Sequence, residues 1–276
     1  MRAGNVLVVT LGSAALILAI WISWQGRRLP VLADRELPTR PVASALDGIR
    51  SIGAIVGAGL VAGLLVPGLG GRLFMRLMAA TSGSAAQGKL TEADEIVGDI
   101  TLGGSVGFVI FVGLILPGAA AFAYLLLRHF LPGPVLVGGL MFGVILLGVF
   151  GVDDPMSPEN VDFEVLEPLV VAVLGIVVLA LLFGLTFGAL ATRFDARLRP
   201  LGSDWHAVPG HAALLFALLP PFFVVTVPYV AIRALARGRT KPWLETSIVR
   251  NTGMGLVVVG TVIAVLVAAD AAIKIL

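Results

Sequence analysis

The residues best suited to chemistry form one charged stretch between two apolar segments. Arg72 and Arg76 are four residues apart, so a helix would place both guanidinium groups on the same face. Glu92, Glu95 and Asp99 follow at spacings of three and four, which would align three carboxylates in the same way. Charges close to lipid are costly unless they are paired or hydrated, so these residues are the first candidates for ligand or ion binding.

Three interpretations of this stretch remain open. In the functional one, the arginines bind an anion at the membrane surface while the carboxylates relay protons or bind a cation. In the structural one, ion pairs between the two groups clamp neighbouring membrane spans together, and in the third the charges are simply solvated. Thr91 and Asp94 have the spacing of a capping box, which predicts a helix that starts there and feeds the next span.

Few other ionisable residues are candidates. Asp270 lies in the last apolar stretch, four residues before Lys274, where it either pairs with that lysine or relays protons. The three histidines, His129, His206 and His211, are either interface residues or cofactor ligands. The sequence has no GxSxG, HExxH, Walker or kinase motif. We therefore assign no catalytic residue, no metal site and no cofactor.

The composition is that of a membrane protein. Apolar residues make up 58% of the chain and charged residues 13%, with a mean hydropathy of +1.02. A soluble domain carries roughly 25% charged residues, so this chain lacks the polar surface of a water-soluble globule. It has no cysteine, which excludes disulfides, iron–sulfur clusters and thiolate zinc sites. The expected partners are the lipid bilayer and other membrane subunits, and no nucleic acid.

Seven stretches are long and apolar enough to cross a bilayer, which requires roughly 20 residues per helix. We predict a single all-α bundle of membrane-spanning helices, with residues 67–99 partly at the interface. The predicted spans cover about residues 6–24, 49–66, 100–127, 135–152, 169–192, 212–232 and 254–273.

Prolines and small residues refine this picture. Pro67, Pro117 and the pair at 220–221 predict helices that are kinked or broken. Small residues recur at four-residue spacing, which lets neighbouring backbones approach closely and predicts a compact bundle. The pairs and the final triplet are Gly53/Gly57, Gly59/Gly63, Gly103/Gly107, Gly139/Gly143, Gly184/Gly188 and Gly260/Ala264/Ala268.

The distribution of basic residues favours an N-terminus outside, with one conflict. The arginine-rich linker 25–48 would then lie inside, and the acidic loop 153–168 outside. With seven crossings, however, the basic segment after residue 232 would also lie outside, against the rule. Either that segment is an exception, or residues 212–232 re-enter the membrane instead of crossing it.

Two segments carry a resemblance to known sequences. GRLFMRLMAATSGSAAQGKLTEADEIVGDITLGGSVGF at 71–108, together with PENVDFEVLEP at 158–168, resembles a group of uncharacterised multi-span membrane proteins of actinobacteria and related high-GC bacteria. The resemblance covers about the middle third of the chain. It implies a location in a bacterial cytoplasmic membrane and no particular activity.

We expect a non-enzymatic function: a small transporter or channel-like protein, or an accessory subunit of a membrane complex. One alternative is an enzyme or binding protein for an anionic lipid or prenyl phosphate, in which Arg72 and Arg76 bind the phosphate. Glu92, Glu95 or Asp99 would then act as base or metal ligand. Another alternative is a cofactor-binding subunit that uses the three histidines.

Overall fold

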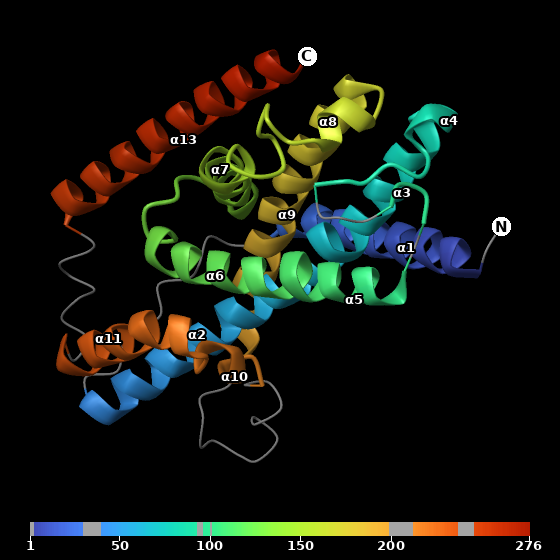
Figure 1. Cartoon of the computed structure of the whole chain (residues 1–276). Helices are drawn as coiled ribbons and strands as arrows, with labels where there is room; N and C mark the ends of the chain where they lie inside the picture. Colours follow the sequence, from blue (N-terminus) through green and yellow to red (C-terminus); the bar gives the residue numbers. More distant parts are fainter. Residues whose placement is uncertain (1–2, 30–39, 93–95, 100, 199–211, 237–245) are drawn as a thin grey trace.

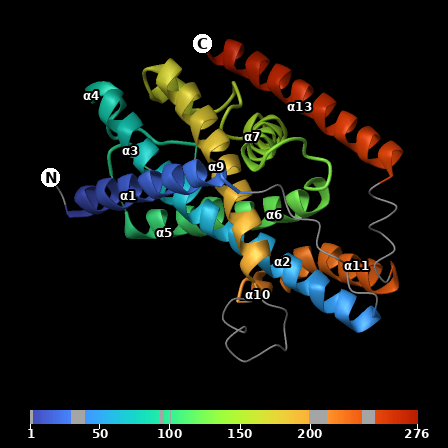
Figure 2. The ribbon, with the colours of Figure 1, turned by 180° about the vertical axis from the view of Figure 1, so that it is seen from behind.

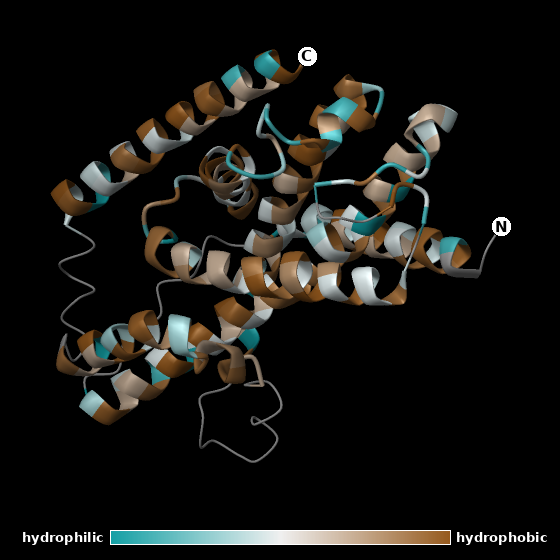
Figure 3. Cartoon of the chain, in the orientation of Figure 1, coloured by the Kyte–Doolittle hydropathy of each residue, from teal (hydrophilic) through white to brown (hydrophobic). Residues whose placement is uncertain are grey.

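The computed structural model describes residues 3–29, 40–92, 96–99, 101–198, 212–236 and 246–276. Their regular elements are all helices, apart from one isolated β-bridge between Leu90 and Ile96. This confirms the predicted all-α bundle. Figure 3 shows that hydrophobic residues dominate the long helices, whereas hydrophilic residues gather in the loops beside α4 and α8.

Several helices run on from one another. Residues 41–81 form one continuous helix from α2 (Pro41–Gly63) through the π-helical η1 (Leu64–Gly70) to α3 (Gly71–Thr81). Residues 102–127 likewise join α5 (Leu102–Ile110), η2 (Phe111–Ile115) and α6 (Leu116–Leu127). The other elements are α1 (Ala3–Gly26), α4 (Gly83–Ala86), α7 (Val135–Leu146), η3 (Leu147–Gly151), α8 (Asp162–Val165), α9 (Leu169–Arg197), α10 (Leu214–Ala217), α11 (Pro220–Ala236) and α13 (Ser247–Ile275).

Five of these helices are long and apolar enough to cross a membrane: Asn5–Gly26, Pro41–Thr81, Leu102–Leu127, Leu169–Arg197 and Ser247–Ile275. Two apolar helices are shorter, Val135–Gly151 and Pro220–Leu235. Large hydrophobic side chains point outward from them, with Ile17 67%, Val224 74% and Leu256 69% exposed. Such surfaces are solvated by lipid, so the chain is an integral membrane protein.

The bundle has two ends. At the first, which we call the arginine end, α1 and α9 finish together, because Arg193 donates to the side-chain oxygen of Gln25 at 2.9 Å. At the opposite end, the loop after α3 meets the loop before α9, because the Glu167 amide donates to the Ser82 hydroxyl at 2.9 Å. Figures 1 and 2 show the C-terminus, α4 and α8 toward this second end, away from α2's first residues and α11.

The predicted proline breaks appear as π-helical segments. Pro67 lies inside η1, and Pro117 is the second residue of α6, which begins where η2 ends. Because proline donates no backbone hydrogen bond, an α-helix must deform locally to include it. The two segments lie against each other, since a Cβ on Gly68 would be 3.1 Å from the Gly113 Cα. Two non-α segments therefore meet within the bundle.

The prediction that a helix starts at Thr91 is wrong. Thr91, Glu92 and residues 96–99 lie in turns and the isolated bridge, and α5 begins only at Leu102. Its N-cap is Thr101, whose hydroxyl accepts from the Gly104 amide at 3.0 Å. The physical reason is Gly98, whose φ of +88° is left-handed and incompatible with a helix running through it. The alignment of Glu92 with Asp99 on one helix face fails for the same reason.

Small residues produce the expected close packing between α7 and α9. A Cβ on Gly139 would lie 2.7 Å from the Gly184 carbonyl oxygen, and one on Gly143 would lie 2.6 Å from that of Ala180. The expectation is wrong for Gly103 and Gly107, which meet nothing within 4 Å in the described structure. The contact brings aromatic rings together nearby, with Tyr124, Phe142 and Phe187 in edge or tilted contacts.

We expect Gly139→Ala to destabilise the bundle, because the added methyl group overlaps backbone that cannot move independently. Such overpacking costs about 1–3 kcal/mol. The matched control is Gly103→Ala, which fills open space and gains up to about 1 kcal/mol of helix propensity. Thermal melting in detergent, followed by tryptophan fluorescence, measures both. Equal melting temperatures for the two variants would show that α7 and α9 do not pack in this way.

Candidate functional site

Five charged side chains from four helical segments meet at the arginine end. We call them the charge cluster: Asp47, Arg50, Arg128, Asp195 and Arg233. The side chains of the three arginines are 2%, 7% and 11% exposed, in that order, and those of the two aspartates 14% and 15%. Burial of so many charges is expensive unless they neutralise one another, which makes the arrangement the strongest candidate site in the described structure.

Arg50 is the centre of the cluster. Its Nε pairs with the Asp47 carboxylate at 3.0 Å, one turn earlier on α2. On its other side, Nη1 donates to the Asp195 carbonyl oxygen at 2.6 Å and Nη2 to the Asp195 carboxylate at 3.3 Å. Asp195 lies in the last turn of α9, where carbonyl groups lack helical donors and the helix dipole favours a cation. One guanidinium therefore ties α2 to the end of α9.

The other two arginines reach the same aspartates from different directions. Arg128 directly follows α6, and its Nη1 lies 3.8 Å from the Asp195 carboxylate. Arg233, near the end of α11, forms an ion pair with Asp47. The Arg233 carbonyl oxygen also accepts a hydrogen bond from the Ser44 hydroxyl at 2.7 Å. Three cations thus share two carboxylates, which leaves the cluster with one excess positive charge.

Several donors in this region have no hydrogen-bond acceptor. Arg128 Nε and Nη1, Arg233 Nε and the Tyr229 hydroxyl are all buried and unpaired within the described structure. Nη1 of Arg128 is near Asp195, but 3.8 Å is too long for a hydrogen bond. Each buried donor without an acceptor destabilises the folded protein by about 1–3 kcal/mol, and by more when it is charged. A bound acceptor would remove this penalty.

A small cavity lies beside Arg128. Its volume is about 40 Å³, and its walls include Tyr124, Arg128, Gly138 and Thr192. The Thr192 hydroxyl already donates to the Gly188 carbonyl oxygen at 3.0 Å. The charged group in the wall of the cavity is that of Arg128. One buried water needs roughly 10–15 Å³ of such space, so the cavity has room for a water or a small anion.

The arginines singled out from the sequence lie at the other end of the bundle. Arg72 donates to the Ser105 hydroxyl at 3.1 Å, and its guanidinium carbon lies 5.3 Å from the centre of the Phe108 ring. These contacts hold α3 against α5. Arg76, one turn later on α3, is partly buried. Arg72 thus has a packing role in this region.

The acidic partners of that region are only partly described. The Glu92 amide donates to the Asp162 carboxylate at 2.9 Å, and the Glu92 carboxylate accepts from the Val161 amide at 3.2 Å. Glu92 therefore binds the acidic loop before α9. Partial burial raises the pKa of Asp162, as do the nearby carboxylates of Glu92 and Asp154, although the amide bond opposes this. Asp99 is exposed, and Glu95 lies outside the described residues.

The last candidates have simple surroundings. Asp270 pairs with Lys274 at 2.7 Å, and both side chains are mostly exposed, so the predicted i,i+4 pair forms. His129 is exposed directly after Arg128, whereas His206 and His211 lie outside the described residues. The described residues include no group of three His, Cys, Asp or Glu side chains placed to hold a metal ion.

Sequence reasoning missed the charge cluster. Asp47 fell in the predicted linker, and Arg50 and Asp195 are 145 residues apart in the chain. The available signal was an Asp–Arg pair at i,i+3 at the edge of an apolar stretch, facing an RFDAR motif at the end of another. A scan against protein families, a search of curated proteins and a search of solved structures found no match for this chain.

We expect Arg50→Met to be strongly destabilising, because it removes the cation that Asp47 and Asp195 share. Loss of one partner from a buried ion pair costs about 3–5 kcal/mol. Lys274→Met is the matched control, since its ion pair is exposed and worth about 0–1 kcal/mol. Melting temperature and monodispersity in detergent report the difference. A stability for Arg50→Met equal to that of the control would mean that the cluster does not hold the helices together.

Proposed function

We propose that this integral membrane protein is non-enzymatic, of the small-transporter or channel-like kind, and that it binds a small anion at the charge cluster. We also propose that it resides in a bacterial cytoplasmic membrane, as the resemblance of residues 71–108 implies. The observation that carries the first proposal is the unpaired, buried guanidinium edge of Arg128 beside a small cavity.

The charge balance supports an anion as the ligand. Three arginines and two aspartates leave one uncompensated positive charge among the described residues of the cluster. An uncompensated charge in a poorly hydrated site is unfavourable, and a bound anion cancels it. The same anion would accept hydrogen bonds from Arg128, which a water molecule satisfies without removing the charge.

The π-helical segments support a transport-like role over a purely structural one. Segments η1 and η2 interrupt two of the long apolar helices and contact each other through Gly68 and Gly113. Interrupted helices in the middle of a membrane protein often accompany binding and permeation sites. An accessory subunit without transport activity is the second form of the same proposal, and anion binding alone does not separate the two.

Anion binding is tested by thermal shift of the purified protein. A ligand that binds only the folded state adds about 2.7 kcal/mol of stability at 100 times its Kd. We therefore expect phosphate, sulfate or chloride to raise the melting temperature above that in gluconate buffer. In Arg128→Gln the rise should be lost, whereas the exposed control Arg250→Gln should keep it. If Arg128→Gln does not fold, Arg128→Lys retains the charge and should show a reduced rise.

The same measurement distinguishes free anions from lipid headgroups. Vesicles of phosphatidylglycerol and of phosphatidylcholine replace the salts, with the same three proteins. Stabilisation by phosphatidylglycerol alone, dependent on Arg128, would identify the anion as a lipid phosphate. If neither salts nor vesicles stabilise the protein, or if Arg128→Gln responds like the wild type, the proposed anion site is wrong.

A further inference from the structure

We propose that residues 212–236 form a hairpin that enters and leaves the membrane at the arginine end, so that the chain crosses the membrane six times. The inference is independent of anion binding, because it rests on where α10 and α11 lie. It resolves the alternative between crossing and re-entry that the basic residues leave open.

The segment enters beside the charge cluster. A Cβ on Gly57 of α2 would lie 3.4 Å from the Ala213 Cβ and 3.7 Å from the Phe194 ring. Phe194 precedes Asp195, the aspartate that Arg50 and Arg128 share. The first residues of the hairpin therefore lie beside the last turns of α9, close to the arginine end.

The deepest point lies near Gly118. Phe222 stacks on the Phe122 ring with a centroid distance of 5.1 Å, and Phe216 packs against Gly118. Gly118 precedes Arg128 by ten residues, so the hairpin reaches about 15 Å into the bundle from that arginine. The Thr226 hydroxyl donates to the Ala217 carbonyl oxygen at 3.1 Å and holds α11 against α10.

The segment then returns to the arginine end. Helix α11 runs back along the first half of α2, where a Cβ on Gly48 would lie 3.9 Å from the Tyr229 ring and 3.5 Å from the Arg233 Cβ. The ion pair of Arg233 with Asp47 and the hydrogen bond from Ser44 fix this end. Figures 1 and 2 both show α10 and α11 beside α2, far from the opposite end of the bundle.

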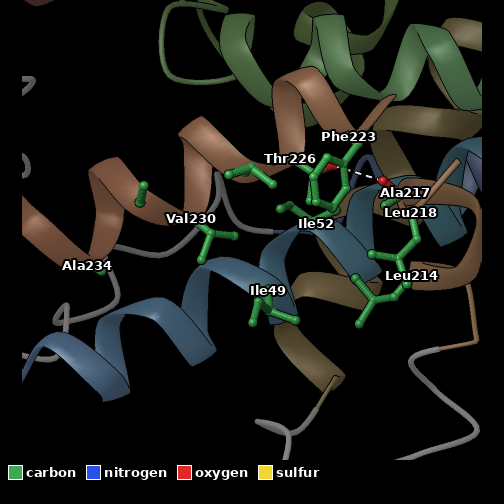
Figure 4. A pocket seen from close by; sticks show the side chains of 11 residues that line it. Ile49, Ile52, Leu214, Ala217, Leu218, Phe223, Thr226, Val230 and Ala234 are labelled. Atoms are coloured by element: carbon green, nitrogen blue, oxygen red, sulfur yellow. Dashed lines mark hydrogen bonds between the residues drawn. The ribbon is translucent and has the colours of Figure 1, made fainter. Parts of the chain in front are cut away.

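The outer face of the hairpin is suited to lipid chains. A groove of about 400 Å³ lies between α2, α10 and α11, and Figure 4 shows Ile49, Ile52, Phe223 and Val230 among its walls. Its hydroxyl group, on Thr226, is already bonded to Ala217. Leu215 and Leu235 are 72% and 80% exposed on the same hairpin. Such a surface is costly in water and favourable in hydrocarbon, so the hairpin is immersed in the bilayer.

The position of α13 agrees with a hairpin that does not cross. Gly253, near the start of α13, lies against the Phe130 ring at the arginine end. Ala271 and Ile275, near its end, pack in one buried group with Leu147 and Met156. Helix α13 therefore runs from the arginine end to the opposite end, where α1 begins.

This arrangement removes the conflict among the basic residues. Most of the basic residues that the structure describes lie at the arginine end: Arg27, Arg28, Arg40, Arg50, Arg128, Arg193, Arg197, Arg233 and Arg250. The described basic residues elsewhere are Arg72, Arg76, Lys89 and Lys274. Because cytoplasmic segments are enriched in basic residues, the arginine end faces the cytoplasm. The acidic loop 153–168 and residue 276 then lie outside.

Cysteine labelling tests the inference, and the chain has no cysteine of its own. Single cysteines replace three exposed residues, Glu159, Ser247 and Leu276. In intact cells, an impermeant maleimide should label Glu159→Cys and Leu276→Cys, whereas Ser247→Cys should react only after the cells are permeabilised. With seven crossings, Glu159→Cys and Leu276→Cys would label from opposite sides, and that result would overturn the hairpin. Labelling of Ser247→Cys alone in intact cells would retain the hairpin and overturn the orientation.

Discussion

The bundle depends on one buried guanidinium group. Arg50 is 2% exposed, and it contacts both the aspartate on its own helix and the aspartate at the end of α9. The two carboxylates in turn hold Arg128 and Arg233, so α2, α6, α9 and α11 meet through a single set of ion pairs. In lipid, where apolar packing gains little from the exclusion of water, such polar contacts specify which helices associate. The ion pairs at the arginine end thus determine how these four helices are arranged.

The excess charge of this cluster is also the basis of the proposed function. A set of ion pairs with three cations and two anions has an excess charge, and Arg128, which keeps unpaired buried donors, also lines a small cavity. A bound anion would cancel this excess, which is why we propose an anion as the ligand. If the arginine end faces the cytoplasm, as we propose from its basic residues, the cluster lies at the cytoplasmic face. In that proposal, the anion would reach Arg128 from the cytoplasm.

The sequence is a good guide to some parts of this protein and a poor one to others. Hydropathy predicts the membrane helices, because the length of an apolar run depends on neighbouring residues alone and must match the thickness of the bilayer. Pro67 and Pro117 correctly predict local breaks, because a proline disturbs the helix at its own position. The capping box at Thr91 fails because Gly98, seven residues later, takes a left-handed conformation. The charge cluster is out of reach of pattern reasoning, because Arg50 and Asp195 are brought together only by the packing of whole helices.

The most direct test of the account is a double-mutant cycle between Arg50 and Asp195. The free energies of unfolding of Arg50→Gln, Asp195→Asn and the double variant are compared with that of the unmodified protein. Residues in one buried ion-pair network show coupling energies of about 0.5–3 kcal/mol, and we expect a value in the upper half of that range. Effects that add within about 0.3–0.5 kcal/mol would show that the two residues act independently, and would contradict the central place of the charge cluster.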